Sequence, residues 1–376
     1  MQATAKCISP AWTVAARIPG EYGRLHEQRS AFMSPRPEKP LPHDRAAARP
    51  VTSYDVARRA GVSQSAVSRC FTEGGSVSKA TRGKIMRAVE ELGYRPNAIA
   101  RSLITQRSNT VAVIVANIGF NPEFTAQLSR TLAARGLHIL LFTLDHESEA
   151  DHIVDQIWQH RVDGVVAAVR LPQRHVETLS RRRIPTVFLN RLDEDSHASS
   201  VCCDPASGER LLVDRLVRAG HRRFGIIRGP VDSTVSLRRV DSAVAQLAAH
   251  GISDLRFADG DFDHASGERG LMLLLNGGHA LDAVVCANDM MALGAMDAAR
   301  FQAGLSVPGD LSVVGFDGVP QGRWPSYDLA TIKQPTREMV EAAADMLIAR
   351  IADPDLPIEK RSFSGQFVAG GSARLG

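Results

Sequence analysis

The stretch TSYDVARRAGVSQSAVSRCFTEGGSVSKATRGKIMRAVEELGYRPNAIARSL, residues 52–103, carries the most informative pattern in this chain. Thr52 followed by Asp55 predicts a helix start, because the hydroxyl can accept an orphan backbone N–H and the carboxylate lies at the positive end of the helix dipole. This first helix should run to about Ala60. Gly61 then permits the tight corner from which a second helix can leave at a steep angle.

The second helix is expected over residues 63–70, SQSAVSRC, with Ser63 as its N-cap. Its small or apolar side chains, Ala66, Val67 and Cys70, would face the first helix. Its polar side chains would then face outward, and polar side chains near a helix start can reach base edges in a DNA major groove. These outward residues are Gln64, Ser65, Ser68 and Arg69.

A third helix is expected to begin near Ser78 and to end at Gly93, with Ile85, Val89 and Leu92 on one stripe. Each of these helices taken alone is compatible with an ordinary capped surface helix. Together they predict a small three-helix DNA-binding head.

The distribution of charge supports a DNA-binding role for this segment. Residues 51–110 hold ten Arg or Lys against four Asp or Glu, whereas residues 111–376 hold 27 against 33. The basic character is therefore concentrated toward the N-terminus, where it could attract phosphates, although a charged surface also suits any small soluble domain.

The segments YDVARRAGVSQSAVSRCF, VSKATRGKI and LGYRPNAIARSL resemble the head of the lactose-repressor and galactose-repressor (LacI/GalR) family of transcriptional regulators. The resemblance extends over nearly everything after residue 50. It implies that Gln64, Ser65 and Arg69 read bases. Ala66 and Cys70 depart from the family, which more often has threonine and an aliphatic residue there, and this puts the operator sequence in doubt.

The resemblance also implies a hinge helix over residues 97–103, in which Leu103 would wedge into a minor-groove step of DNA. The alternative is a linker helix in which Ala98, Ile99 and Leu103 pack on the body of the protein. The complete set of expected DNA-contacting residues is Thr52, Ser53, Tyr54, Ser63, Gln64, Ser65, Ser68, Arg69, Asn97, Ala100 and Leu103.

From Val111 onward, short apolar runs such as VAVIVA, PTVFL and LSVVGF alternate with amphipathic stretches, which indicates parallel sheets covered by helices on both faces. The resemblance implies a two-lobed, periplasmic-binding-protein-like α/β core behind an all-α helix-turn-helix head. The expected organisation is a disordered tail (1–50), a helix-turn-helix domain (51–95), a hinge helix and linker (96–108), and an effector-binding and dimerisation core (109–376) with lobe crossings near 204 and 330–335.

Ligands in open α/β sheets bind beyond the carboxyl ends of the strands. Asn190 follows such a strand, and the family commonly places a ligand-binding arginine at the position of Arg239. The alternatives are that Asp289 caps a helix, that Asp317 stabilises a turn and that Arg239 is solvated. Ser242 and Ala243 replace the family's usual glycine-aromatic pair, so we expect a pocket wall that differs from the family's. The expected ligand-binding residues are Phe124, Asn190, Arg191, Arg239, Phe262, Asn288, Asp317 and Trp324.

Marks of other functions are missing from the sequence. It contains no GxGxxG, GxxxxGK[ST], GxSxG or HExxH motif, so we expect no catalytic residues. His152 and His160 are expected on an exposed helix face rather than at a metal site, and no cofactor is expected. No apolar run reaches the length of a membrane span, and the five cysteines form no CxxC pair, which fits a reducing cytoplasm.

The sequence therefore predicts a bacterial cytoplasmic regulator, most simply a repressor, that binds a near-palindromic operator as a homodimer or a higher oligomer. A small metabolite such as a sugar would act in the cleft between the lobes. The alternatives are a regulator whose cleft binds a protein or nothing, a secreted sugar-binding protein and an α/β enzyme. Translation from Met33 rather than Met1 is a further hypothesis, suggested by the lack of structural pattern in the tail.

Overall fold

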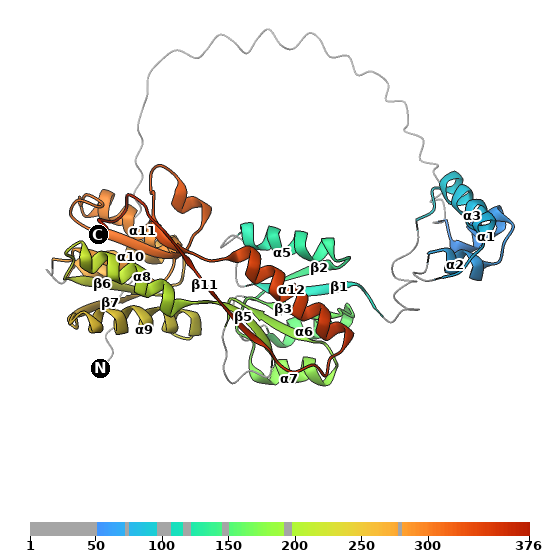
Figure 1. Cartoon of the computed structure of the whole chain (residues 1–376), viewed down its shortest axis with the longest axis horizontal. Helices are drawn as coiled ribbons and strands as arrows, with labels where there is room; N and C mark the ends of the chain where they lie inside the picture. Colours follow the sequence, from blue (N-terminus) through green and yellow to red (C-terminus); the bar gives the residue numbers. More distant parts are fainter. Residues whose placement is uncertain are drawn as a thin grey trace, which may run out of the picture. The chain divides into compact units, whose positions relative to one another are not determined.

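The computed structural model describes residues 51–71, 75–95, 107–115, 122–144, 150–191, 198–276 and 280–376. The chain forms two compact units, Met1–Pro96 and Asn97–Gly376 (Figure 1).

The first unit contains three helices in its described part: α1 (Ser53–Ala60), α2 (Gln64–Phe71) and α3 (Lys79–Leu92) (Figure 1). Gly61 and Gly93 end α1 and α3 in the left-handed conformation, with φ of 64° and 60°, which glycine adopts without steric cost. The buried side chains of the three helices form one cluster: Val56, Ala57, Val67, Cys70, Ile85 and Ala88.

Polar caps fix where these helices begin. Asp55 Oδ2 accepts a hydrogen bond from the Thr52 N–H at 2.9 Å, as part of a capping box. Ser63 Oγ accepts from the Ala66 N–H at 3.3 Å, and Ser78 Oγ accepts from the Thr81 N–H at 3.1 Å. Side-chain oxygens thus satisfy backbone donors at the helix starts, as the sequence predicts.

The second unit contains two six-stranded sheets, each forming a lobe with its helices. The first sheet has the order β11-β5-β4-β3-β1-β2, and all its strand pairs are parallel. Its strands are β1 (Thr110–Val115), β2 (His138–Thr143), β3 (Gly164–Ala167), β4 (Thr186–Leu189), β5 (Ser199–Asp204) and β11 (Lys360–Ser364).

Helices cover both faces of this first sheet, because its inner strands β1, β3, β4 and β5 are buried on both sides. Ala112 and Ile114 of β1 pack in the cluster that includes α6 and α7, while Val111 and Val113 pack in the cluster that includes α5 and α12. Figure 1 shows the two pairs of helices on opposite sides of the sheet. These helices are α5 (Pro122–Ala134), α6 (Ala150–Gln159), α7 (Gln173–Arg181) and α12 (Thr336–Ala352).

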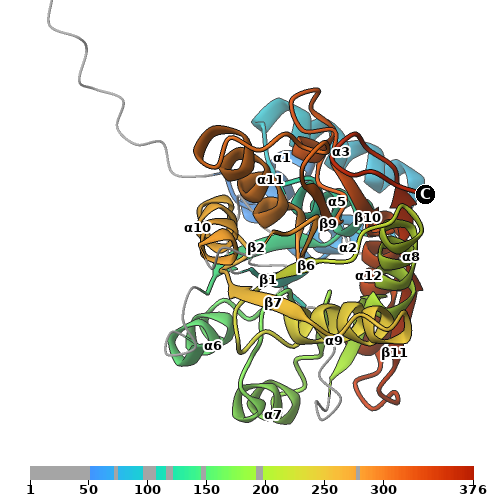
Figure 2. The same ribbon diagram turned by 90° about the vertical axis from the view of Figure 1, so that its left-hand side faces the viewer.

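The second sheet has the order β12-β10-β9-β8-β6-β7, and its edge strand β12 runs antiparallel to β10. Its strands are β6 (Phe224–Arg228), β7 (Leu255–Asp259), β8 (Ala283–Cys286), β9 (Ser312–Asp317), β10 (Ala330–Lys333) and β12 (Gln366–Val368). Its helices are α8 (Pro205–Arg218), α9 (Thr234–Ala249), α10 (His264–Leu275) and α11 (Asp289–Asp297), and Figure 2 shows α8 and α9 together and α10 and α11 together.

Within the described residues, the chain passes between the two lobes at three places: from β5 to α8, from β10 to α12, and from β11 to β12 (Figure 1). The third passage is not among the crossings expected near 204 and 330–335. It turns at Gly365, where a Cβ atom would lie 2.3 Å from Ile332 Cγ2 and 3.3 Å from Cys203 Sγ. A glycine is therefore required where these strands meet.

Candidate functional site

The start of α2 presents polar side chains at the surface of the first unit. Ser65 and Arg69 are exposed, whereas Gln64 and Ser68 are partly buried. Gln64 Nε2 donates a hydrogen bond to Ser53 Oγ at 3.4 Å, which ties the start of α2 to the start of α1. The polar side chains of α2 lie on one face because its opposite face, with Ala66, Val67 and Cys70, is buried against the other two helices.

Other predicted DNA-contacting residues surround this face or lie beyond it. Tyr54 on α1 is 66% exposed, so its ring is accessible to a partner. Thr52 and Ser53 are partly buried. Asn97, Ala100 and Leu103 lie outside the described residues, so the expected hinge helix stays a prediction.

The second unit has a small cavity between its lobes, where strands of the first sheet end and helices of the second lobe begin. Asn190 comes from the end of β4, Pro205 begins α8, and Arg239 lies in the second turn of α9. The complete lining is Asn190, Cys202, Cys203, Pro205, Val235, Arg238 and Arg239.

Arg239 is held in a buried ion pair rather than solvated. Its Nη2 donates to Asp317 Oδ1 at 2.8 Å and its Nη1 donates to the Ala287 carbonyl at 2.7 Å. Its guanidinium carbon lies 4.0 Å from the centre of the Phe316 ring. Burial raises the pKa of the Asp317 carboxyl, and the Arg239 charge acts in the opposite direction. Arg239 is therefore fixed in orientation before any ligand arrives.

Arg191 reaches from the first lobe to the second. Its Nε donates to the Ala168 carbonyl at 3.3 Å, and its Nη1 donates to Ser233 Oγ at 3.2 Å. Burial, and then the neighbouring Arg239 charge, lower the pKa of Arg191 to about 10. The neighbouring Asn190 adopts φ of 56°, a left-handed conformation that asparagine tolerates better than most residues.

Asn288, and not Asp289, caps α11. Its Oδ1 accepts from the Met291 N–H at 3.0 Å, and its Nδ2 donates to the Phe262 carbonyl at 2.9 Å. The alternative that made Asp289 the cap is therefore wrong. Asp289 instead accepts hydrogen bonds from the Gly318 and Val319 N–H groups, and burial followed by the Asp317 charge raises its pKa to about 7.

The three aromatic residues expected at the ligand do not line this cavity. Phe262 packs over Gly229, where a Cβ atom would lie 2.3 Å from its ring, and Phe124 is partly buried against the core. Trp324 is 55% exposed beside Tyr327, with ring centroids 6.5 Å apart. Their contact with a ligand stays a prediction.

Sequence reasoning missed several cavity residues, and the reason is the topology. Cys202, Cys203 and Pro205 reach the cavity only because β5 leads directly into the first passage between lobes. Arg238 lines the cavity together with Arg239 although the two are adjacent on α9. The one available signal was Asp204-Pro205, a helix cap followed by proline, which marks the start of α8.

A buried acid lies close to this region. Glu209 on α8 is 1% exposed, and its Oε2 has no hydrogen-bond partner among the described residues. Burial raises its pKa to about 8, against a smaller opposing effect of the Arg239 charge. Glu209 is therefore mostly uncharged at neutral pH in the folded protein.

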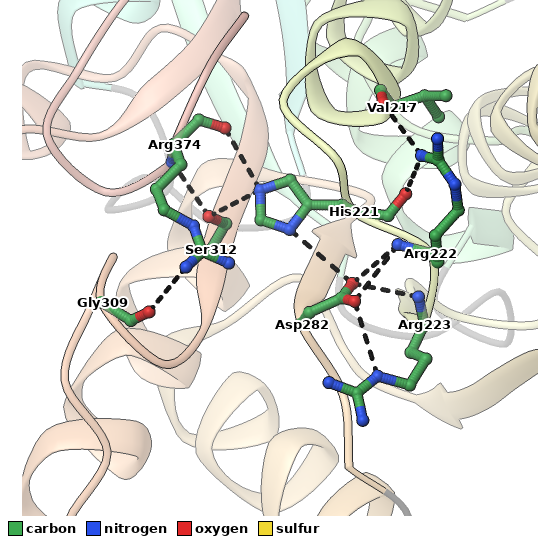
Figure 3. A network of polar contacts seen from close by, with 8 residues as sticks. All are labelled: Val217, His221, Arg222, Arg223, Asp282, Gly309, Ser312 and Arg374. Atoms are coloured by element: carbon green, nitrogen blue, oxygen red, sulfur yellow. Dashed lines mark hydrogen bonds and ion pairs between the residues drawn. The ribbon is translucent and has the colours of Figure 1, made fainter.

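A Ser-His-Asp arrangement in the second lobe raises the question of hydrolysis. His221 Nε2 lies 3.1 Å from Ser312 Oγ, and His221 Nδ1 lies 3.6 Å from Asp282 Oδ1 (Figure 3). However, Nε2 also lies 3.2 Å from the Arg374 carbonyl, which can only accept, so Nε2 carries the proton and cannot deprotonate the serine. The hydroxyl and the ring are 0% and 1% exposed. The network thus anchors the C-terminal segment to β9.

Two features of the described residues bear on other functions. They contain no group of three or more His, Cys, Asp or Glu side chains arranged to hold a metal ion. Among the same residues, no helix has the length and apolar character needed to cross a membrane.

Comparison with known proteins supports the reading of both units. Residues 52–97 match the family model "Bacterial regulatory proteins, lacI family", and residues 213–373 match "Periplasmic binding protein-like domain". The HTH-type transcriptional regulator AscG of Escherichia coli K12 is 32% identical over 84% of this chain and 96% of its own length. The ribose operon repressor of the same organism is 31% identical over 86% of this chain and 99% of its own length.

A solved structure extends the likeness to three dimensions. The lac repressor dimer bound to operator and the anti-inducer ONPF matches with a TM-score of 0.79 and 27% identity, over 87% of this chain and all of that one. The helix-turn-helix and α/β fold classes are thereby confirmed. The chain belongs to the lacI family of bacterial regulatory proteins and is a ligand-responsive, DNA-binding transcriptional regulator.

Proposed function

We propose that this regulator is a repressor that binds a near-palindromic operator as a dimer, and that a small metabolite in the interlobe cavity controls its affinity for DNA. The observation that carries the proposal is the exposed polar start of α2, with Ser65 and Arg69, on a chain whose second unit has a cavity between lobes that Asn190, Arg238 and Arg239 help to line. A ribose operon repressor and a lac repressor dimer bound to operator are among its relatives.

The chemistry of α2 suits base recognition. A guanidinium such as that of Arg69 can donate two hydrogen bonds to the O6 and N7 atoms of a guanine, and one such contact contributes about 1–3 kcal/mol of discrimination. Ser65 and Gln64 can add shorter contacts to bases or phosphates. Two heads related by two-fold symmetry would read two half-sites about one helical turn apart, which is why we expect a near-palindromic operator.

Control by a metabolite follows from the position of the cavity between lobes. The two lobes can take two relative arrangements, and a ligand that contacts both lobes favours one of them. The ligand changes the affinity for DNA only because it binds the two arrangements with different affinities. Residues 97–103, which connect the head to the core, would carry this change to the DNA. An inducer would favour the arrangement with low DNA affinity, and a corepressor would favour the other.

We further propose that the protein has no catalytic step of its own and acts in the bacterial cytoplasm. The proton on His221 Nε2 and the burial of Ser312 argue against hydrolysis by that network. The similar proteins are transcriptional regulators and a repressor of Escherichia coli, for which the cytoplasm is where the DNA is found.

The test is to select bound fragments from sheared genomic DNA with the full-length protein and to measure affinity for the recovered sequence by fluorescence anisotropy. Replacing Arg69 with Ala should weaken specific binding at least about tenfold, the loss of one bidentate contact. Arg181→Ala, at an exposed position of α7, is the matched control and should bind as the wild type does. Failure to recover a shared sequence, or an equal loss in both variants, would refute the assignment of α2.

A further inference from the structure

The three passages between the lobes lie toward one edge of each sheet. In the first sheet, two of them use β5 and its neighbour β11, which is the outermost strand on that side. In the second sheet, they use β10 and its neighbour β12, which is again the outermost strand. The covalent connections therefore hold the lobes together on one side, and a rotation about that side is the motion that they restrict least.

Arg191 joins the lobes at a point away from these passages. It follows β4, and its Nε donates to the carbonyl of Ala168, which follows β3, at 3.3 Å. Its Nη1 donates at 3.2 Å to Oγ of Ser233, which lies between β6 and α9 of the second lobe. In the second sheet, β8 and β9 separate β6 from β10. One guanidinium thus connects the two lobes at a distance from the covalent connections.

Ser233 also fixes the start of α9, which is a wall of the interlobe cavity. The side chain of Ser233 is buried, and its Oγ accepts the Ser236 N–H at 3.3 Å as the N-cap of α9. Arg239 lines the cavity from this helix, and Asn190 lines it from the first lobe beside Arg191. A movement that breaks the bond between Arg191 and Ser233 therefore separates the two walls of the cavity.

The contact between Arg191 and Ser233 is of limited strength. A hydrogen bond from a charged donor changes an equilibrium constant about tenfold or more. Burial and then the Arg239 charge act against the charged form of Arg191, and they lower its pKa to about 10, whereas exposed Asp232 favours the charged form. Because this cost opposes the bond, the closed and open arrangements of the lobes lie closer in free energy than the bond alone would place them.

We propose that Arg191 and Ser233 form a strap that holds the lobes in the closed arrangement and releases them when the cleft opens. The inference deepens the proposed function, because it names a contact that sets the balance between the two arrangements. A carboxylate at position 233 would strengthen the strap, since a bond between two charged groups is stronger than a bond to a neutral hydroxyl, and aspartate caps a helix as serine does. Glycine at the same position would remove the acceptor at little cost to the cap.

Two buried thiols report the opening of the cleft. Cys202 and Cys203, here called the cavity cysteines, line the cavity and are buried. The experiment measures, by peptide mass spectrometry, the rate at which N-ethylmaleimide labels each thiol of the full-length protein at constant pH. When the cleft opens and closes faster than it is labelled, this rate is proportional to the open fraction. Cys286, which is buried in β8, is the internal control for unfolding of the second lobe.

We expect Arg191→Met and Ser233→Gly each to label the cavity cysteines about tenfold faster than wild type does, with no change at Cys286. Ser233→Asp should slow the labelling of the cavity cysteines about tenfold. This slowing should vanish in the double variant with Arg191→Met, because the carboxylate then has no guanidinium to bind. Arg181→Met, at an exposed position of α7, is the matched control and should be labelled as wild type is.

Equal labelling of the cavity cysteines in wild type, Arg191→Met and Ser233→Gly would overturn the strap. The same slowing by Ser233→Asp with and without Arg191 would overturn it too. Labelling that rises in proportion at the cavity cysteines and at Cys286 would also overturn it, because the variants would then unfold the lobe. These rates are measured without DNA, whereas the Arg69→Ala test concerns the proposed function alone, so the two proposals can fail separately.

Discussion

Replacing Glu209 with Gln should raise the free energy of unfolding at neutral and alkaline pH. The Glu209 carboxyl is 1% exposed and lacks a partner for Oε2 among the described residues, and its pKa rises from 4.5 to about 8 on folding. The folded protein therefore holds a proton that the unfolded chain releases. The stability that the protonated Glu209 carboxyl contributes is fully present below about pH 4.5 and is lost as the pH rises toward 8.

The size of this change in stability follows from the difference between the folded and unfolded pKa values of Glu209. One unit of pKa difference corresponds to about 1.4 kcal/mol, so the destabilisation from Glu209 grows to about 4 kcal/mol near pH 8, less whatever the site recovers by relaxation. A glutamine has nearly the same shape and no proton to lose. We therefore expect Glu209→Gln to be close to wild type at pH 5 and about 2–4 kcal/mol more stable at pH 8.

The assay is urea unfolding of the full-length protein at pH 5, 6, 7 and 8. Far-UV circular dichroism follows the unfolding, because the three tryptophans of the chain, Trp12, Trp158 and Trp324, emit together. Glu177→Gln, at an exposed position on α7, is the matched control and should show the pH dependence of wild type. If Glu209→Gln and wild type have parallel stabilities from pH 5 to 8, the buried acid is not neutral in the folded state and the reasoning is refuted.

Three further predictions concern the ion pair, the histidine network and the hinge. Arg239→Ala should destabilise the second unit by about 3–5 kcal/mol in urea unfolding, because it leaves Asp317 buried without its partner, and a loss below 1 kcal/mol would contradict the ion pair. Burial lowers the pKa of His221. The stability that the neutral His221 ring contributes is therefore present above the unfolded pKa of 6.5 and is lost as the pH falls below that value. Between pH 7 and 5, His221→Gln should lose less stability than wild type, and equal losses would show that His221 does not cause the pH dependence. Leu103→Ala should weaken specific operator binding, measured by anisotropy, far more than nonspecific binding, whereas equal losses would exclude a wedge in the minor groove.

The three-helix head could be predicted from sequence because its signals are local. Ser63, Ser78 and Gly93 act as caps through contacts within a few residues, and the buried face of α2 follows from helical periodicity. The apolar strands of the core were equally visible, since VAVIVA and LSVVGF are continuous runs.

The edges of the core and much of the cavity could not be predicted in the same way. The strands β11 and β12 are short and contain exposed residues, so their place is set by pairing with β5 and β10, far away in the sequence. Long-range contacts also decide the partners of ionisable groups. Nothing local to Arg239 reveals that it pairs with Asp317, and nothing local to Glu209 reveals that it is buried without a partner.

The most direct test of a ligand-responsive, DNA-binding regulator is a DNase I footprint on a selected genomic fragment, with and without the small-molecule fraction of the cells from which the DNA was taken. We predict a protected region of about 20 base pairs with two-fold symmetric sequence, whose protection changes when the small-molecule fraction is added. Protection without symmetry, or protection that is the same at every concentration of the small-molecule fraction, would contradict this account.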